Sequence, residues 1–266
     1  MAAERDTLPT DRNDPNSGGS HRKSLRRSAE ESLRRLATDH VDPLWAHAWD
    51  ECTAAEETLR ALDDLIRSGK VLAVGVRNTP AWVIARSQAI AELRGWSAYC
   101  GPQIEYSLAA GSPDRELLPM ARALGLTVTA WSPLARGLLA GKRPPSRLPA
   151  SRRQALDAVT EIAAETGLTP ARVARAWVLR QGLLPVPGTR TVAQLRDNLG
   201  ALAVRLDGKQ LERLDAATRV RREYPYDFLY DRRTALAPPE PERGITMAEH
   251  RWRLWNAQFE QGVPRV

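Results

Sequence analysis

Cysteine is scarce in this sequence, and its apolar runs are short. Only two cysteines occur among 266 residues, Cys52 and Cys100, and neither lies in a CxxC motif or a Cys/His ligand pattern. This spacing excludes a disulfide framework and a zinc site and predicts two buried free thiols. No apolar run approaches the roughly 20 residues that cross a bilayer, and the first residues do not resemble a signal peptide. We therefore expect a globular, cytoplasmic protein.

Lysine is also rare, because 35 of the 39 basic side chains are arginines. The formal net charge is +7, but the arginines are scattered along amphipathic segments and form no single tract. Compositional bias explains this charge better than nucleic-acid binding does, although a small ligand that carries phosphate would still be attracted. Neither nucleic acid nor membrane is an expected partner.

The chain is long enough, with 42% hydrophobic residues, to bury a sizeable core. Residues 1–22 are polar, rich in Gly, Pro and Ser and without periodicity, which predicts a flexible N-terminal arm. Residues 23–218 should form the folded domain, and 219–266 a C-terminal extension. Within that extension, Thr246 and Glu249 are typical of a capping box, and the aromatic residues that follow predict an amphipathic helix.

Helical and strand-like patterns alternate along the domain. Apolar residues at helical spacing predict helices, such as one over 53–70 with Thr53 as N-cap and Gly69 as C-cap. The other expected helices are 22–37, 80–95, 115–125, 151–167, 169–182 and 191–203. Strands are expected at 41–46, 71–78, 97–107, 126–134 and 183–189. This alternation predicts an α/β fold with right-handed crossovers and a mainly parallel sheet of five strands.

Polar or small residues stand where each expected strand ends. They are His47, Asn78, Gln103, Ser132 and Gly188. In parallel α/β folds, ligands bind at the carboxyl ends of the strands, so these side chains are candidates for one shared site. Taken singly, Asn78 is also typical of a turn and His47 of a structural role.

Five phrases, in order, resemble one family, the aldo-keto reductases. They are VDPLWAHAWD at 41–50, GKVLAVGVRNTPAW at 69–82, PQIEYSL at 102–108, TVTAWSPLARGLLAGK at 127–142 and PVPGTRTVAQLRDNLGA at 185–201. The resemblance covers about Asp11 to Asp215. It implies a (β/α)8 TIM-barrel fold, here a truncated barrel of about five βα units, which binds NADPH and passes a hydride to a small-molecule carbonyl substrate.

The resemblance also implies residue roles. His47 matches the histidine that orients and polarises the carbonyl, Asn78 and Gln103 match the holders of the nicotinamide amide, and Trp131 matches the stacking aromatic. The expected phosphate and adenosine contacts are Ser132, Leu134, Gly137, Gly188, Thr189, Arg190, Gln194 and Asn198. Arg190 would meet a 2'-phosphate. Without the resemblance, Trp131 would be assigned to the core and Arg190 to solvent.

The family's proton donor has no counterpart in the matched region. The resemblance places an Asp, a Tyr and a Lys in the first three βα units, and those units are not matched here. Arg77 stands where the family usually has serine, so its cation would either obstruct the nicotinamide pocket or mimic the charge of the ring. Pro43 lies within the first expected strand, which is tolerable mainly at a sheet edge.

Three interpretations follow. In the first, the chain is an aldo-keto-reductase-like oxidoreductase, which is impaired if the Asp, Tyr and Lys are truly missing. In the second, it is a pseudoenzyme that binds a nucleotide or a partner without turnover. In the third, it is a structural remnant that has neither activity nor binding. Two open sheet edges would need cover, which the C-terminal extension, a second copy or a partner subunit would provide.

Overall fold

Contacts divide the chain into two units, Met1–Val220 and Arg221–Val266. The computed structural model describes residues 2–3, 11, 13–14, 16–141, 147–221 and 223–232. In the second unit, the described part holds the short helix α9, Tyr226–Asp231. The amphipathic helix expected after Thr246 lies outside the described residues. The candidate site lies entirely in the first unit.

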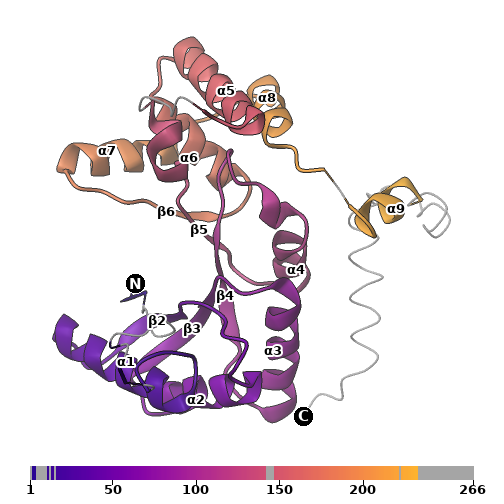
Figure 1. The fold of residues 1–266 in the computed structure, drawn as a ribbon. Coiled ribbons are helices and arrows are strands. Elements are labelled where there is room, and N and C mark those ends of the chain that lie inside the picture. The colour runs from indigo at the N-terminus through magenta and orange to yellow at the C-terminus, as the bar shows by residue number, and fades with distance from the viewer. Residues whose placement is uncertain are drawn as a thin grey trace, which may run out of the picture. The chain divides into compact units, whose positions relative to one another are not determined.

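The first unit contains one parallel sheet whose strands follow one another in chain order (Figure 1). Its strands are β1 Ala2–Ala3, β2 Val41–Ala46, β3 Val71–Arg77, β4 Tyr99–Glu105, β5 Thr129–Trp131 and β6 Leu184–Val186. The five predicted strands are confirmed, and β1 adds a two-residue pairing with β2. β5 and β6 are only three residues long, shorter than predicted.

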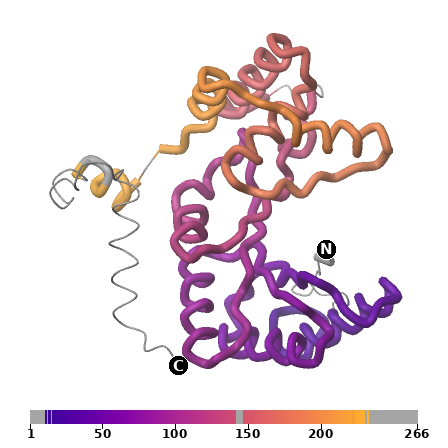
Figure 2. The backbone as a smooth tube through the Cα atoms, turned by 180° about the vertical axis from the view of Figure 1, so that it is seen from behind, coloured from indigo at the N-terminus to yellow at the C-terminus, as the bar shows by residue number. Residues whose placement is uncertain are grey.

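Helices connect the strands, and the backbone trace shows this alternation along the chain (Figure 2). They are α1 Arg22–Leu36, α2 Ala55–Arg67, α3 Ala81–Arg94, α4 Leu117–Ala123, α5 Ala150–Thr166, α6 Pro170–Arg180, α7 Val192–Gly200 and α8 Gly208–Thr218. Short 3-10 helices are η1 Ser112–Asp114, η2 Ala135–Ala140 and η3 Ala201–Ala203. α8 was not predicted, although Asp207 and Gln210 form a capping box at its start.

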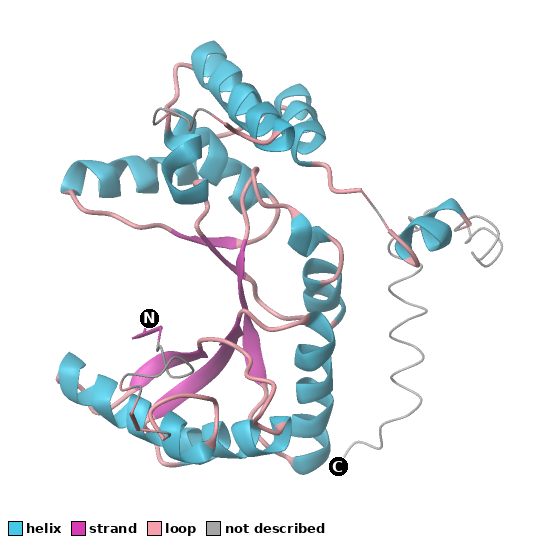
Figure 3. Ribbon diagram, in the orientation of Figure 1, coloured by secondary structure: helices cyan, strands magenta, loops and turns pink. Residues whose placement is uncertain are grey.

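The sheet curls into a half-barrel, with α2, α3 and α4 along its convex side (Figure 3). Two apolar clusters hold this arrangement together. One joins β2 and β3 to α1, α2 and α3 through residues such as Leu44, Leu62 and Val74. The other joins β4 and β5 to α5, α6 and α8 through residues such as Ile104, Val159 and Trp177. Burial of these side chains is the main stabilising contribution. The concave face is therefore the one left for a ligand.

Two local predictions were wrong. Helix α2 begins after Ala54 without a side-chain cap. Thr53 is not its N-cap, because the Asp50 carboxylate accepts the Thr53 N–H and fixes a turn before the helix. Both cysteines are free as expected, but they are exposed. Cys52 lies in that same turn, and Cys100 lies where the pairing of β3 with β4 is irregular.

Part of the segment predicted as a mobile arm makes specific contacts. Ser17 and Ser20 are buried. The Ser20 N–H donates to the Asp50 carboxylate, and the Thr58 hydroxyl donates to the Ser20 carbonyl oxygen at 3.0 Å. These bonds attach the chain before α1 to the loop after β2 and to helix α2. In the described part of the chain, no helix has the length and apolar character required to span a bilayer.

Candidate functional site

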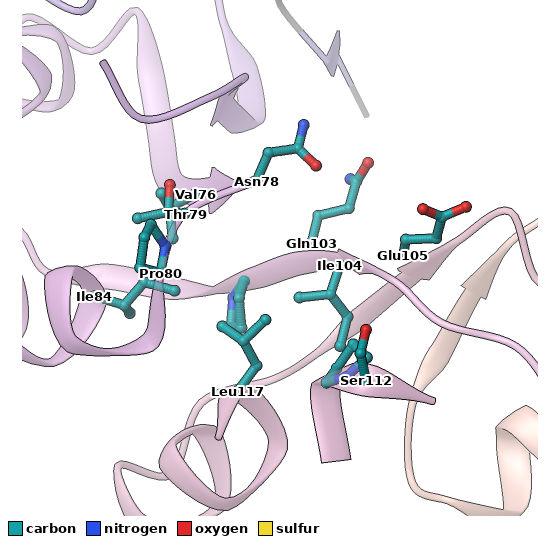
Figure 4. Close-up of a pocket in the computed structure, with 12 residues that line it drawn as sticks. Val76, Asn78, Thr79, Pro80, Ile84, Gln103, Ile104, Glu105, Ser112 and Leu117 are labelled. Carbon is teal, nitrogen blue, oxygen red and sulfur yellow. The ribbon is translucent and has the colours of Figure 1, made fainter. Parts of the chain in front are cut away.

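Strand register places polar side chains in a row across the concave face. Arg77 on β3 pairs with Gln103 on β4, which pairs with Thr129 on β5. Paired residues of parallel strands face the same side of a sheet, and alternate residues face opposite sides. Figure 4 shows this alternation, because Gln103 and Glu105 point to one side of β4 and Ile104 points to the other. The row therefore lies opposite the helix-covered side.

Asn78 joins the ends of β2 and β3. Its side-chain amide donates to the backbone carbonyl oxygen of His47 at 2.9 Å. The backbone carbonyl oxygen of Asn78 accepts the Trp49 N–H at 3.5 Å. The backbone of Asn78 has a φ of 46°, in the left-handed region that asparagine tolerates better than most residues. The structure thus brings two predicted site residues, His47 and Asn78, into direct contact.

Gln103 carries a buried amide nitrogen that has no partner among the described residues. The side chain is 2% exposed, and its Nε2 makes no hydrogen bond with any described residue. The Thr129 hydroxyl and the Trp131 Nε1 are buried and unpartnered in the same sense, and both lie on the neighbouring strand β5. Buried donors without partners cost free energy, so in native proteins such groups bond to a ligand, an ion or an ordered water. Two of these three groups can only donate, so a ligand there would present acceptor atoms.

Arg77 extends from β3 toward β5. Its guanidinium carbon lies 4.9 Å from the centre of the Trp131 ring, within the range of a cation–π interaction. Trp131 pairs with Glu105, so the Arg77 side chain crosses β4 to reach it. This contact was not predicted as part of the site, although the sequence had marked Arg77 as unusual.

The loop after β5 has an unusual backbone. Ser132, Ala135, Arg136 and Gly137 all have positive φ, and the last three of these residues are consecutive. The loop is closed by hydrogen bonds from the Ala135 N–H to the Ser132 carbonyl oxygen at 2.9 Å and from the Gly137 N–H to the Leu134 carbonyl oxygen at 2.9 Å. The Arg136 N–H donates to the Ser132 hydroxyl at 3.2 Å, so the N–H groups of residues 135–137 all bond within the loop. The predicted residues Ser132, Leu134 and Gly137 are therefore in one tight loop.

The last group of predicted residues surrounds the start of α7. Gly188, Thr189 and Arg190 are exposed between β6 and this helix. The Gln194 side chain accepts the Arg190 N–H at 2.8 Å, and the Thr191 hydroxyl caps the helix by accepting the Gln194 N–H at 3.2 Å. Asn198 is buried, and its Nδ2 has no partner among the described residues. No hydrogen bond of the described residues joins this group to Asn78 or Gln103.

Tyr106 follows β4 but serves the core. Its ring stacks on that of Trp177 with 5.4 Å between the ring centres, and its hydroxyl donates to the Asp114 carboxylate at 3.0 Å. Burial, together with the nearby Asp114 carboxylate, raises the pKa of Tyr106 far above its usual value. A proton donor needs a pKa closer to the working pH. Tyr106 is therefore a structural residue.

Comparison with known proteins identifies the same family over most of the chain. The Aldo/keto reductase family model matches residues 8–219. Norsolorinic acid reductase stcV of Emericella nidulans is 32% identical over 258 residues, which cover 93% of this chain. The uncharacterized oxidoreductase YrpG of Bacillus subtilis is 39% identical over 219 residues, which cover 76% of this chain and 67% of that protein.

A solved structure agrees with this result. The crystal structure of a thermostable aldo-keto reductase in complex with the inhibitor epalrestat superposes with a TM-score of 0.64 and 29% sequence identity. The superposition covers 74% of this chain and 67% of that one. The chain spans 65% of the length of the Emericella reductase. The half-barrel thus corresponds to part of a longer fold in its relatives.

Proposed function

Because the chain belongs to the aldo/keto reductase family, we propose that it supplies the NADPH-binding part of an oxidoreductase that reduces an aldehyde or a ketone to an alcohol. The observation that carries this proposal is Gln103 at the carboxyl end of β4, whose buried amide nitrogen Nε2 has no hydrogen-bond partner among the described residues. An amide there suits the carboxamide of a nicotinamide ring, which offers both a donor and an acceptor. Asn78 lies at the end of the adjacent strand.

In this proposal, the other predicted residues contact different parts of the cofactor. Trp131 provides an aromatic face for the nicotinamide ring, and the loop of Ser132, Leu134 and Gly137 is assigned to the pyrophosphate. The adenosine end is assigned to Gly188, Thr189, Arg190, Gln194 and Asn198. Among these, Arg190 is exposed and can meet a 2'-phosphate. Bound NADPH supplies a hydride.

His47 acts on the substrate in this proposal. It directly follows β2, and its carbonyl oxygen is held by the Asn78 amide at 2.9 Å, which fixes the backbone at that position. An imidazole N–H can donate to a carbonyl oxygen, orienting it and increasing its electrophilic character. Reduction also needs a proton for the developing alkoxide. His47 can deliver it when the imidazole is protonated.

Replacement of Gln103 by methionine tests the proposal. Gln103→Met removes a buried amide nitrogen without a partner among the described residues and keeps the side-chain length, so stability should stay the same or rise. Affinity for NADPH should fall by about tenfold or more, since one hydrogen-bonding group is lost. Titration followed by tryptophan fluorescence and a thermal melt measure the two effects. Unchanged affinity for NADPH would exclude Gln103 from the site, and no binding to the unmodified chain would reject the proposal.

A second candidate is nucleotide binding without turnover. It is favoured by Tyr106, the tyrosine that follows β4, because its hydroxyl is committed to Asp114 and its pKa is raised. The two functions differ in one measurement. An oxidoreductase oxidises NADPH saturably with an aldehyde, whereas a binding module is stabilised by NADPH but leaves it unoxidised.

A further inference from the structure

We propose that Arg77 makes the cofactor site selective for the reduced nicotinamide over the oxidised one. This inference rests on the proposed function, and it concerns the charge of the ring rather than its presence. The reduced ring is neutral and the oxidised ring is a cation. A positive charge held close to the ring therefore disfavours only the oxidised form.

The position of the charge follows from strand register. Arg77 is the last residue of β3 and pairs with Gln103. Its guanidinium lies 4.9 Å from the centre of the Trp131 ring, two strands away on β5. The cation therefore extends across β4, on the side of the sheet where the buried Gln103 amide and the Trp131 Nε1 lack partners.

This arrangement affects any planar ring that uses Trp131. A ring that stacks on the indole face next to Arg77 takes the place of the guanidinium there. The backbone of Arg77 is fixed in β3 by its pairing with β4, so the displaced guanidinium stays near the site. Two positive charges about 6 Å apart in a partly buried site change affinity by roughly threefold to a hundredfold, depending on the local dielectric.

A carboxylate also lies at this edge of the sheet. Glu105 pairs with Trp131, and its carboxylate lies on the same side of β4 as Gln103 (Figure 4). Glu105 is exposed, so water screens much of its effect. Its charge opposes that of Arg77 and reduces the selectivity. Removing this carboxylate should therefore increase the preference for the reduced cofactor.

The test compares NADPH with NADP+, which carry the same phosphates and differ in the nicotinamide ring. Dissociation constants for both are measured by calorimetry with the unmodified chain, Arg77→Met, Arg77→Lys and the surface control Arg86→Met. We expect the unmodified chain to bind NADPH more tightly. Arg77→Met should lower the ratio of the NADP+ constant to the NADPH constant by about tenfold, mainly through tighter NADP+ binding. Arg77→Lys and Arg86→Met should keep the ratio.

The outcomes separate this inference from the proposed function. If both nucleotides bind and Arg77→Met leaves their ratio unchanged, the inference is wrong and the proposed function stands. If neither nucleotide binds to the unmodified chain, both are wrong. Should Arg77→Met fail to fold in a thermal melt, Arg77→Gln provides a second neutral side chain. Glu105→Gln should raise the ratio, and a fall in the ratio would also contradict the assignment.

Discussion

The ring of Trp45 covers Gly75 on the adjacent strand, so that a Cβ atom built on Gly75 would lie 2.5 Å from two atoms of the indole. The two residues are paired in register between β2 and β3, and both are buried. Only glycine leaves room for the indole at this point. This contact fixes the position of the Trp45 ring on the concave face, beside the row of Arg77, Gln103 and Thr129.

Gly75→Ala should therefore destabilise the chain. The added methyl group would force the indole or the strand to move, at a cost of about 1–3 kcal/mol. Chemical denaturation measures the loss of unfolding free energy. Gly208→Ala is the matched control, because a Cβ there meets nothing within 4 Å. Equal stability of the two variants would show that Trp45 moves aside freely.

Asp63 should make stability depend on pH. This carboxylate is 2% exposed and accepts the Ser97 N–H and hydroxyl and the Arg67 Nε–H. Burial acts to raise its pKa, but the hydrogen bonds from Ser97 and Arg67 prevail and lower it below the usual value of 3.8. A lowered pKa in the folded state means that the stabilisation is complete above the unfolded pKa and is lost as the pH falls through the folded one.

The test is Asp63→Asn. It should cost about 1–2 kcal/mol at pH 7, and the difference from the unmodified chain should shrink below about pH 4. Denaturant unfolding at several pH values provides the measurement. Asp42→Asn, at an exposed position on β2, serves as control and should have little effect. A constant difference across the whole pH range would contradict the assignment.

Tyr106→Phe should affect stability alone. It deletes the hydroxyl that donates to Asp114 at 3.0 Å and leaves the stacking on Trp177 in place. We expect a loss of about 1 kcal/mol, because the buried Tyr106 side chain loses its hydrogen bond to the exposed Asp114 carboxylate. NADPH affinity and any carbonyl reduction should be unchanged. A large fall in turnover without a change in stability would instead make Tyr106 a proton donor.

Arg190→Ala should change the choice between phosphorylated and unphosphorylated cofactors. The side chain is exposed before α7, where a 2'-phosphate is expected in the proposed function. Its loss should weaken NADPH binding by about tenfold, since a charge-assisted contact disappears. NADH binding should stay the same, so the ratio of the two dissociation constants is the measurement. An equal loss for both would place Arg190 elsewhere on the cofactor or outside the site.

The sequence by itself determined the elements of the sheet and the family. Periodicity found the five longer strands because each is a short apolar run between amphipathic helices, and that alternation depends on local residue order alone. Five phrases with their order and spacing carried the family resemblance, which the match over residues 8–219 confirms. The first residues of helices were predicted less accurately than the strands. Thr53 is not the N-cap of α2, because the Asp50 carboxylate accepts the Thr53 N–H and fixes a turn before the helix.

Only the tertiary structure decided which side chains meet. Arg77 and Trp131 are 54 positions apart in the sequence, and their contact depends on the register of three strands. The sequence also does not show that the amide nitrogen of Gln103 lacks a partner among the described residues, because this depends on what the fold places around that side chain. Local patterns fix where a strand ends, whereas the pairing of strands fixes which groups share its face.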